Sequence, residues 1–170
     1  EVLRPARRQK SVLRLLDQLA SQQHRSDSPP APSASTEHRL DTALAEARRV
    51  AHTGSRIFVI SDFMDVTGST TSLLGALARH NSVSAIRILD PLENELPPRG
   101  RFAVAGPDGP IWFDASNTAF QRAWREKVAT HERQLSDCFR TSGVQAATIL
   151  TQQEPATALR ILLGPGGRIG

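Results

Sequence analysis

Apolar residues in this chain recur at two spacings, which together predict alternating helices and strands. Four stretches repeat an apolar residue every three to four positions, as amphipathic helices do; they cover residues 9–20, 37–51, 68–81 and 117–142. Three short segments are predicted strands; they cover residues 57–60, 83–89 and 144–150. The first is a continuous apolar run, typical of a strand buried on both faces of a parallel sheet, and the second is also predicted to be buried. A last helix is expected from Pro155 to Gly164. The alternation predicts an α/β fold with a parallel sheet.

Three segments fall outside this alternation. Residues 102–104 and 111–113 flank a Gly-Pro-Asp-Gly turn, which predicts a β-hairpin. Residues 24–36 are rich in proline and serine and are expected to form a loop. The glycine-rich residues 165–170 are expected to form a flexible tail.

Length and composition are those of one globular domain. The chain has 170 residues, the length of a single domain, and its 39% of hydrophobic residues excludes a mainly disordered chain. No apolar run approaches the roughly 20 residues that span a membrane. A single cysteine, Cys138, excludes a disulfide framework, and we expect a cytoplasmic setting. The chain begins at Glu1 without a methionine or a signal peptide, so we expect it to be part of a longer protein.

The positive charge is concentrated at one end of the chain. Of the formal net charge of +4, +3 comes from the first ten residues, which hold Arg4, Arg7, Arg8 and Lys10 against Glu1. No aromatic residues interleave with these charges, as they do in many surfaces that bind single-stranded nucleic acid. Nucleic-acid binding, which would depend steeply on salt, is therefore the least favoured function.

Three motifs carry a resemblance to a known family. They are Arg56-Ile-Phe-Val-Ile-Ser-Asp-Phe-Met-Asp65, Leu77-Ala-Arg-His80 and Ile86-Arg-Ile-Leu-Asp-Pro-Leu-Glu-Asn-Glu-Leu-Pro97. With them, the chain resembles the C-terminal part of the domain-of-unknown-function family 58, a branch of the von Willebrand factor A-like domains. The resemblance implies a Rossmann-like parallel sheet with helices on both faces and a β-hairpin insertion. Family members carry the first strands of the sheet upstream, with an Asp-X-Ser-X-Ser metal motif, so we expect residues 1–170 to be a single, partial domain that lacks those strands.

The same resemblance implies a metal-ion-dependent adhesion site. Asp62 follows a predicted parallel strand, where open α/β sheets place their ligands. By resemblance, Asp62 and Asp65 would contribute to a Mg²⁺ or Mn²⁺ site in the full-length protein, and Thr36 can stand for the family's threonine. Such cations take several oxygen ligands, and two carboxylates alone are too few. For this chain alone, the favoured interpretation is that Ser61 and Asp62 only satisfy the turn between strand and helix.

The residues do not indicate a complete catalytic site. Asp62 and Asp65 resemble the paired aspartates of aspartyl-phosphate hydrolases, but the second aspartate comes one position late. The five histidines lack metal-ligand spacing, and Cys138 lies on the apolar stripe of the predicted long helix. A metal-dependent hydrolase that uses Asp62 and Asp65 is the alternative function, although a base and further ligands are missing.

The resemblance instead implies a non-enzymatic interaction domain. Members of the family accompany MoxR-type AAA+ ATPases, as adaptors in protein maturation or assembly. By resemblance, the partner would contact a surface around the strand ends; its residues are Asp62, Phe63, Asp65, Leu92 and Glu93. Missing upstream strands would leave a sheet edge exposed, and such edges pair with other chains. A homo-oligomer or a swapped arrangement is therefore expected.

Overall fold

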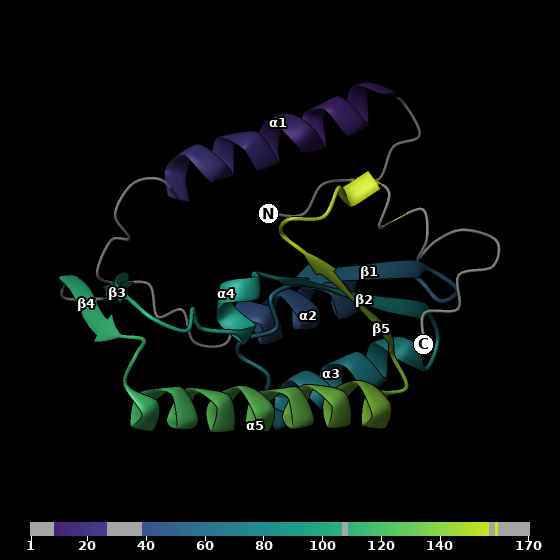
Figure 1. The fold of residues 1–170 in the computed structure, drawn as a ribbon. Helices are drawn as coiled ribbons and strands as arrows, with labels where there is room; N and C mark the ends of the chain where they lie inside the picture. The colour runs from purple at the N-terminus through teal and green to yellow at the C-terminus, as the bar shows by residue number, and fades with distance from the viewer. Residues whose placement is uncertain (1–8, 27–38, 107–108, 157–158, 160–170) are drawn as a thin grey trace. The chain divides into compact units, whose positions relative to one another are not determined.

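The structure is a computed structural model that describes residues 9–26, 39–106, 109–156 and 159 (Figure 1). The chain divides into two compact units, Glu1–Thr36 and Glu37–Gly170. Within the described ranges, none of the helices is both long and apolar enough to cross a membrane.

In the first unit, the structure describes the helix α1, from Gln9 to Ser26. It extends the predicted helix beyond residue 20, so the prediction that residues 24–26 belong to the loop is wrong. Polar residues continue the helix here without adding to its apolar stripe, which is why the hydrophobic pattern ended too early. The exposed residues of α1 include Leu13 and, from the predicted apolar stripe, Leu15, Leu16 and Leu19. Thr36 and the rest of the predicted loop lie outside the described residues.

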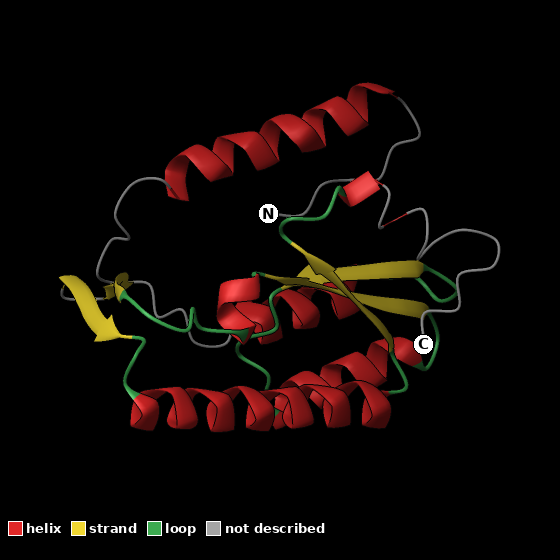
Figure 2. Cartoon of the chain, in the orientation of Figure 1, coloured by secondary structure: helices red, strands yellow, loops and turns green. Residues whose placement is uncertain are grey.

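The second unit is built on a three-stranded parallel sheet (Figure 2). Its strands are β1 (Arg56–Ser61), β2 (Ser82–Leu89) and β5 (Gln145–Leu150), in the order β1-β2-β5. Val59 lies beside Ala85, which in turn lies beside Ala146. The predicted α/β class and its three parallel strands are confirmed.

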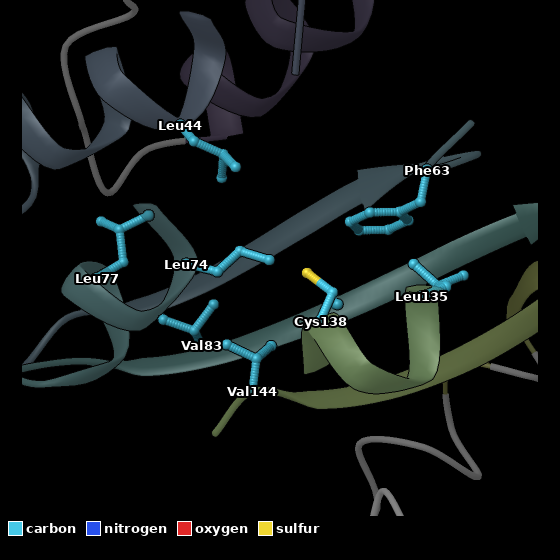
Figure 3. Packing of buried hydrophobic residues seen from close by; sticks show 9 residues of the cluster. Leu44, Phe63, Leu74, Leu77, Val83, Leu135, Cys138 and Val144 are labelled. Atoms are coloured by element: carbon cyan, nitrogen blue, oxygen red, sulfur yellow. The ribbon is translucent and has the colours of Figure 1, made fainter. Parts of the chain in front are cut away.

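Three helices pack on one face of this sheet. They are α2 (Arg39–Val50), α3 (Gly68–Ala78) and α5 (Thr118–Ser142). Alternate strand residues point into the core that they share, whose buried members include Leu44, Leu74, Val83, Leu135 and Cys138 (Figure 3). Gly143 ends α5 in the left-handed conformation, with a φ of 69° that favours glycine.

The opposite face of the sheet is covered unevenly. On β2, Ile86 is buried, as expected of a central strand. On β1, Phe58 and Ile60 are 41% and 64% exposed. The prediction that this strand is buried on both faces is therefore wrong, because β1 lies at the edge of the described sheet and packs on one face only.

A helical turn and a hairpin connect β2 to α5. The turn is α4 (Pro91–Asn94), and the antiparallel hairpin consists of β3 (Arg101–Gly106) and β4 (Gly109–Asp114). The hairpin confirms the prediction. A row of aromatic rings, Phe102, Phe113, Phe120 and Trp124, joins it to α5, with neighbouring centroids 5.1–6.4 Å apart. Of the helix predicted from Pro155, residues 155, 156 and 159 are helical, and the remainder lies outside the described residues, as does the predicted tail.

Candidate functional site

The loop that follows β1 is a turn fixed by its own side chains. The Ser61 hydroxyl accepts a hydrogen bond from the backbone N–H of Phe63 (3.1 Å). The Asp62 carboxylate accepts from the backbone N–H of Met64 and from the Ser61 hydroxyl, both at 3.2 Å. These bonds are what the favoured interpretation of Ser61 and Asp62 requires, since both side chains satisfy the turn. Asp62, Met64 and Asp65 are exposed in this turn, at the carboxyl end of the strand.

Phe63 anchors this turn in the core. Its side chain has no exposed surface and lies among the other buried residues (Figure 3). The ring meets that of Phe139 edge-on, with centroids 5.2 Å apart. The expectation that Phe63 contacts a partner is therefore corrected, since a fully buried ring presents nothing to one. Among the residues that the structure describes, Phe63 is the one non-glycine residue with a positive φ, which is 54°. This left-handed conformation costs roughly 1–2 kcal/mol. Burial of the ring offsets that strain, and the turn consequently presents its polar neighbours outward.

The described residues do not form a metal site by themselves. Asp62 and Asp65 are exposed, and one oxygen of Asp62 already accepts two hydrogen bonds within the turn. Across the part of the chain that the structure describes, no three histidine, cysteine, aspartate or glutamate side chains are grouped to hold a metal ion. Thr36 is outside that part. The assignment of Mg²⁺ or Mn²⁺ to Asp62, Asp65 and Thr36 stays a prediction.

The segment after β2 presents a second set of exposed residues. Asp90 caps α4, because its carboxylate accepts from the backbone N–H of Leu92 (2.9 Å), and Pro91 occupies the first helical position. Leu92 is 60% exposed, and Glu93 is exposed beside it. Both residues were selected from the sequence, and the structure places both at the surface.

A groove of about 690 Å³ brings these two segments together with α5. We call it the α4–α5 groove; its lining includes Met64, Asp65, Glu93, Trp124, Lys127 and His131. Among the residues selected from the sequence, it unites Asp65 and Glu93, whereas Asp62 and Leu92 are not part of its lining. The contribution of α5 was not foreseen, because its alternating charges are typical of a solvated helix face.

Arg87 also lines the groove, although it belongs to the central strand. Its side chain is buried and pairs with Glu132 of α5, with Nη1 and Oε1 2.6 Å apart. A buried charge requires such a partner. The pair thus ties the end of β2 to α5 at the groove.

Sequence reasoning also missed a network that joins α2 to α3. The Asp41 carboxylate accepts hydrogen bonds from the hydroxyls of Thr67 (2.9 Å) and Thr70 (2.5 Å). These two threonines form the capping box at the start of α3. A local signal existed in the Thr-Gly-Ser-Thr sequence, but nothing in the sequence near Asp41 indicates its partners.

Two titratable groups have pKa values that their surroundings shift. Burial raises the pKa of the Cys138 thiol, so the less reactive protonated form is favoured. The pKa of Asp114 is lowered, first by the Ser116 hydroxyl and then by the Ser116 backbone N–H. Both groups donate to the same Asp114 oxygen. Asn117 caps α5 directly afterwards, so this segment builds a helix start.

Comparison with models of protein families shows a family that covers most of the chain. The family model described as "Protein of unknown function DUF58" matches residues 1–134, more than three quarters of the chain. The matched range contains the turn after β1, all of α4 and most of α5, and with them the α4–α5 groove. Neither the curated proteins nor the solved structures gave a match.

Proposed function

This chain belongs to the DUF58 family, and we propose that it is a non-enzymatic interaction domain that acts as an adaptor with a MoxR-type AAA+ ATPase. The resemblance described above supports that partner and a von Willebrand factor A-like arrangement of the sheet. The observation that carries the proposal is the exposed surface on the segments after β1 and β2. There, Met64 and Leu92 are 50% and 60% exposed, beside the carboxylates of Asp62, Asp65 and Glu93. We call these five residues the strand-end surface.

The local structure of these segments supports a binding role. Binding residues commonly lie on loops that a rigid scaffold positions. Here Phe63 fixes the first segment from the core, and the Asp90 cap fixes the second. A surface whose backbone is already ordered loses little conformational entropy when a partner binds. Exposed apolar side chains on ordered turns are therefore available for contact at low cost.

The hydrolase alternative finds no supporting observation. Asp62 is engaged in its own turn, and the described residues contain no cluster of metal-ligating side chains around it. The buried Cys138 thiol does not supply a nucleophile either. We therefore propose the interaction function alone.

Binding of the purified chain to a purified MoxR-type AAA+ ATPase from the same organism tests the proposal. We expect saturable binding by biolayer interferometry, weakened at least tenfold, or by ~1.4 kcal/mol, in Met64→Asp and Leu92→Asp. Ile111→Asp is the matched control, because Ile111 is similarly exposed but lies on β4. Absence of binding by the unmodified chain would overturn the partner. If Ile111→Asp weakened binding as much as the two other substitutions, the assignment of binding to the strand-end surface would be overturned.

A further inference from the structure

Three buried nitrogen atoms without hydrogen-bond partners belong to residues that line the α4–α5 groove. They are Nε of Arg87, Nε1 of Trp124 and Nε2 of His131. Arg87 is paired through Nη1 only, and its side chain is more than nine-tenths buried. A buried polar group that lacks a partner costs about 1–3 kcal/mol, and native structures contain few. All three belong to side chains that line one groove, so an occupant of that groove is a source of acceptors for them.

The chemistry of these atoms identifies what the occupant must offer. The indole N–H of Trp124 and the Nε–H of Arg87 are donors only, and an imidazole nitrogen donates or accepts. The occupant must therefore carry at least two acceptors. Small shifts of these side chains would expose the donors to it. Carbonyl oxygens of a peptide backbone are such acceptors, and they repeat along an extended chain.

The charge of the lining favours a peptide over a free anion. Asp65, Glu93 and Glu126 place three carboxylates in the lining, against Lys127. Glu126 pairs with Arg122 along α5 (3.8 Å), so Asp65 and Glu93 carry the excess negative charge. The Arg87 charge is already balanced by Glu132. An anion would be repelled by this excess of carboxylates, whereas neutral carbonyls beside a cationic side chain match it.

The length of the groove fits a short segment. A second hollow, of about 420 Å³, shares Asn94 and Trp124 with the α4–α5 groove and continues it to Gln121. Between Gln121 and Gln134, α5 rises by about 20 Å at roughly 1.5 Å per residue. An extended chain covers that distance in about six residues.

We propose that the α4–α5 groove binds a short extended segment of a partner protein that carries a basic side chain next to an apolar one. The basic side chain pairs with Asp65 and Glu93, the apolar one packs beside Met64 and Trp124, and backbone carbonyls accept from the unpaired donors. The inference rests on the proposed function, because Asp65 and Glu93 belong to the strand-end surface, and it names the chemistry that this surface recognises.

Selection from a library of random heptapeptides, displayed on phage, tests the inference. We expect the immobilised chain to enrich peptides that combine lysine or arginine with leucine, isoleucine or phenylalanine. A synthetic peptide from the selection should shift the emission of Trp124 in the Trp112→Phe background, where Trp124 is the only tryptophan. Inorganic phosphate should leave the emission unchanged. No enrichment, enrichment of acidic peptides, or a shift with phosphate would overturn the proposal.

Charge reversal locates the peptide on the groove. In Asp65→Lys combined with Glu93→Lys, we expect the selected peptide to bind at least tenfold more weakly. In Glu46→Lys, which reverses an exposed carboxylate on α2, the change should stay below twofold. Equal affinity in all three proteins would place the peptide elsewhere and overturn the proposal. If the ATPase still depends on Met64 and Leu92 while no peptide binds, the groove inference alone fails; if peptides bind and the ATPase does not, only the proposed partner fails.

Discussion

Phe63 determines where the neighbouring residues can act. Its backbone is held in the left-handed region while its ring is fully buried, so the turn carries local strain that the core offsets. As a result, the residues on either side, Asp62 and Met64, cannot turn inward and are presented to solvent. Strain of this kind tends to persist where a particular presentation is needed.

Replacement of this anchor should cost much of the stability of the fold. For Phe63→Ala we expect a loss of about 3–5 kcal/mol in the free energy of unfolding, because a large buried ring is removed. Urea denaturation monitored by circular dichroism measures it. Phe58→Ala is the matched control, since Phe58 lies on β1 but is 41% exposed, and its loss should be clearly smaller. Equal losses would show that Phe63 is not an anchor.

For single residues, the sequence predicted the place of a residue relative to the strands better than the direction of its side chain. Asp62 was selected because it follows a predicted strand, and the structure confirms that placement. The burial of Phe63 could not be predicted, since it sits in a polar turn without periodicity and depends on Phe139, far along the chain. The unpaired nitrogens of Trp124 and His131 could not be predicted from the sequence either, because they result from tertiary packing.

Among the elements, the predictions succeeded where periodicity is long. The long helix α5 and the hairpin have clear sequence patterns, and both are present. β1 and β2 were both predicted to be buried strands, yet one lies at the edge of the described sheet and the other in the middle. Strand order decides between those two environments, and it is not encoded locally. α4 escaped prediction because Pro91–Asn94 is too short to show a helical period.

The Asp41 network makes the packing of α2 against α3 testable. For Asp41→Ala we expect a loss of about 3 kcal/mol in the free energy of unfolding, because each hydrogen bond to a charged group contributes ~1.5–3 kcal/mol and Thr70 is left buried without its acceptor. Asp41→Asn retains an acceptor and should lose less. Thermal and urea unfolding provide the measurement.

Glu46→Ala is the control for this network. It removes another carboxylate from α2, one that is exposed and pairs with Arg49 within the helix. We expect a change below about 0.5 kcal/mol, as is usual for surface substitutions. If Asp41→Ala were no more destabilising than Glu46→Ala, the two hydroxyl bonds would not stabilise the contact between the helices.

For the second unit as a whole, the core and the exposed surfaces are separated. The helices cover one face of the sheet, while the strand-end surface lies at the carboxyl ends of β1 and β2. β1 has a neighbour on one side only within the described sheet, and Phe58 and Ile60 remain exposed on its open face. The expected homo-oligomer, which would use such an edge, stays a prediction.

The central claim, that the strand-end surface contacts the ATPase, is tested most directly by site-specific photo-crosslinking. Benzoylphenylalanine is placed at position 64, after β1, and in a second protein at position 111, on β4. Each protein is irradiated with the ATPase, and the adducts are mapped by mass spectrometry. We predict an adduct from position 64 and none from position 111. A bound ATPase that crosslinks from position 111 but not from position 64 would contradict the account.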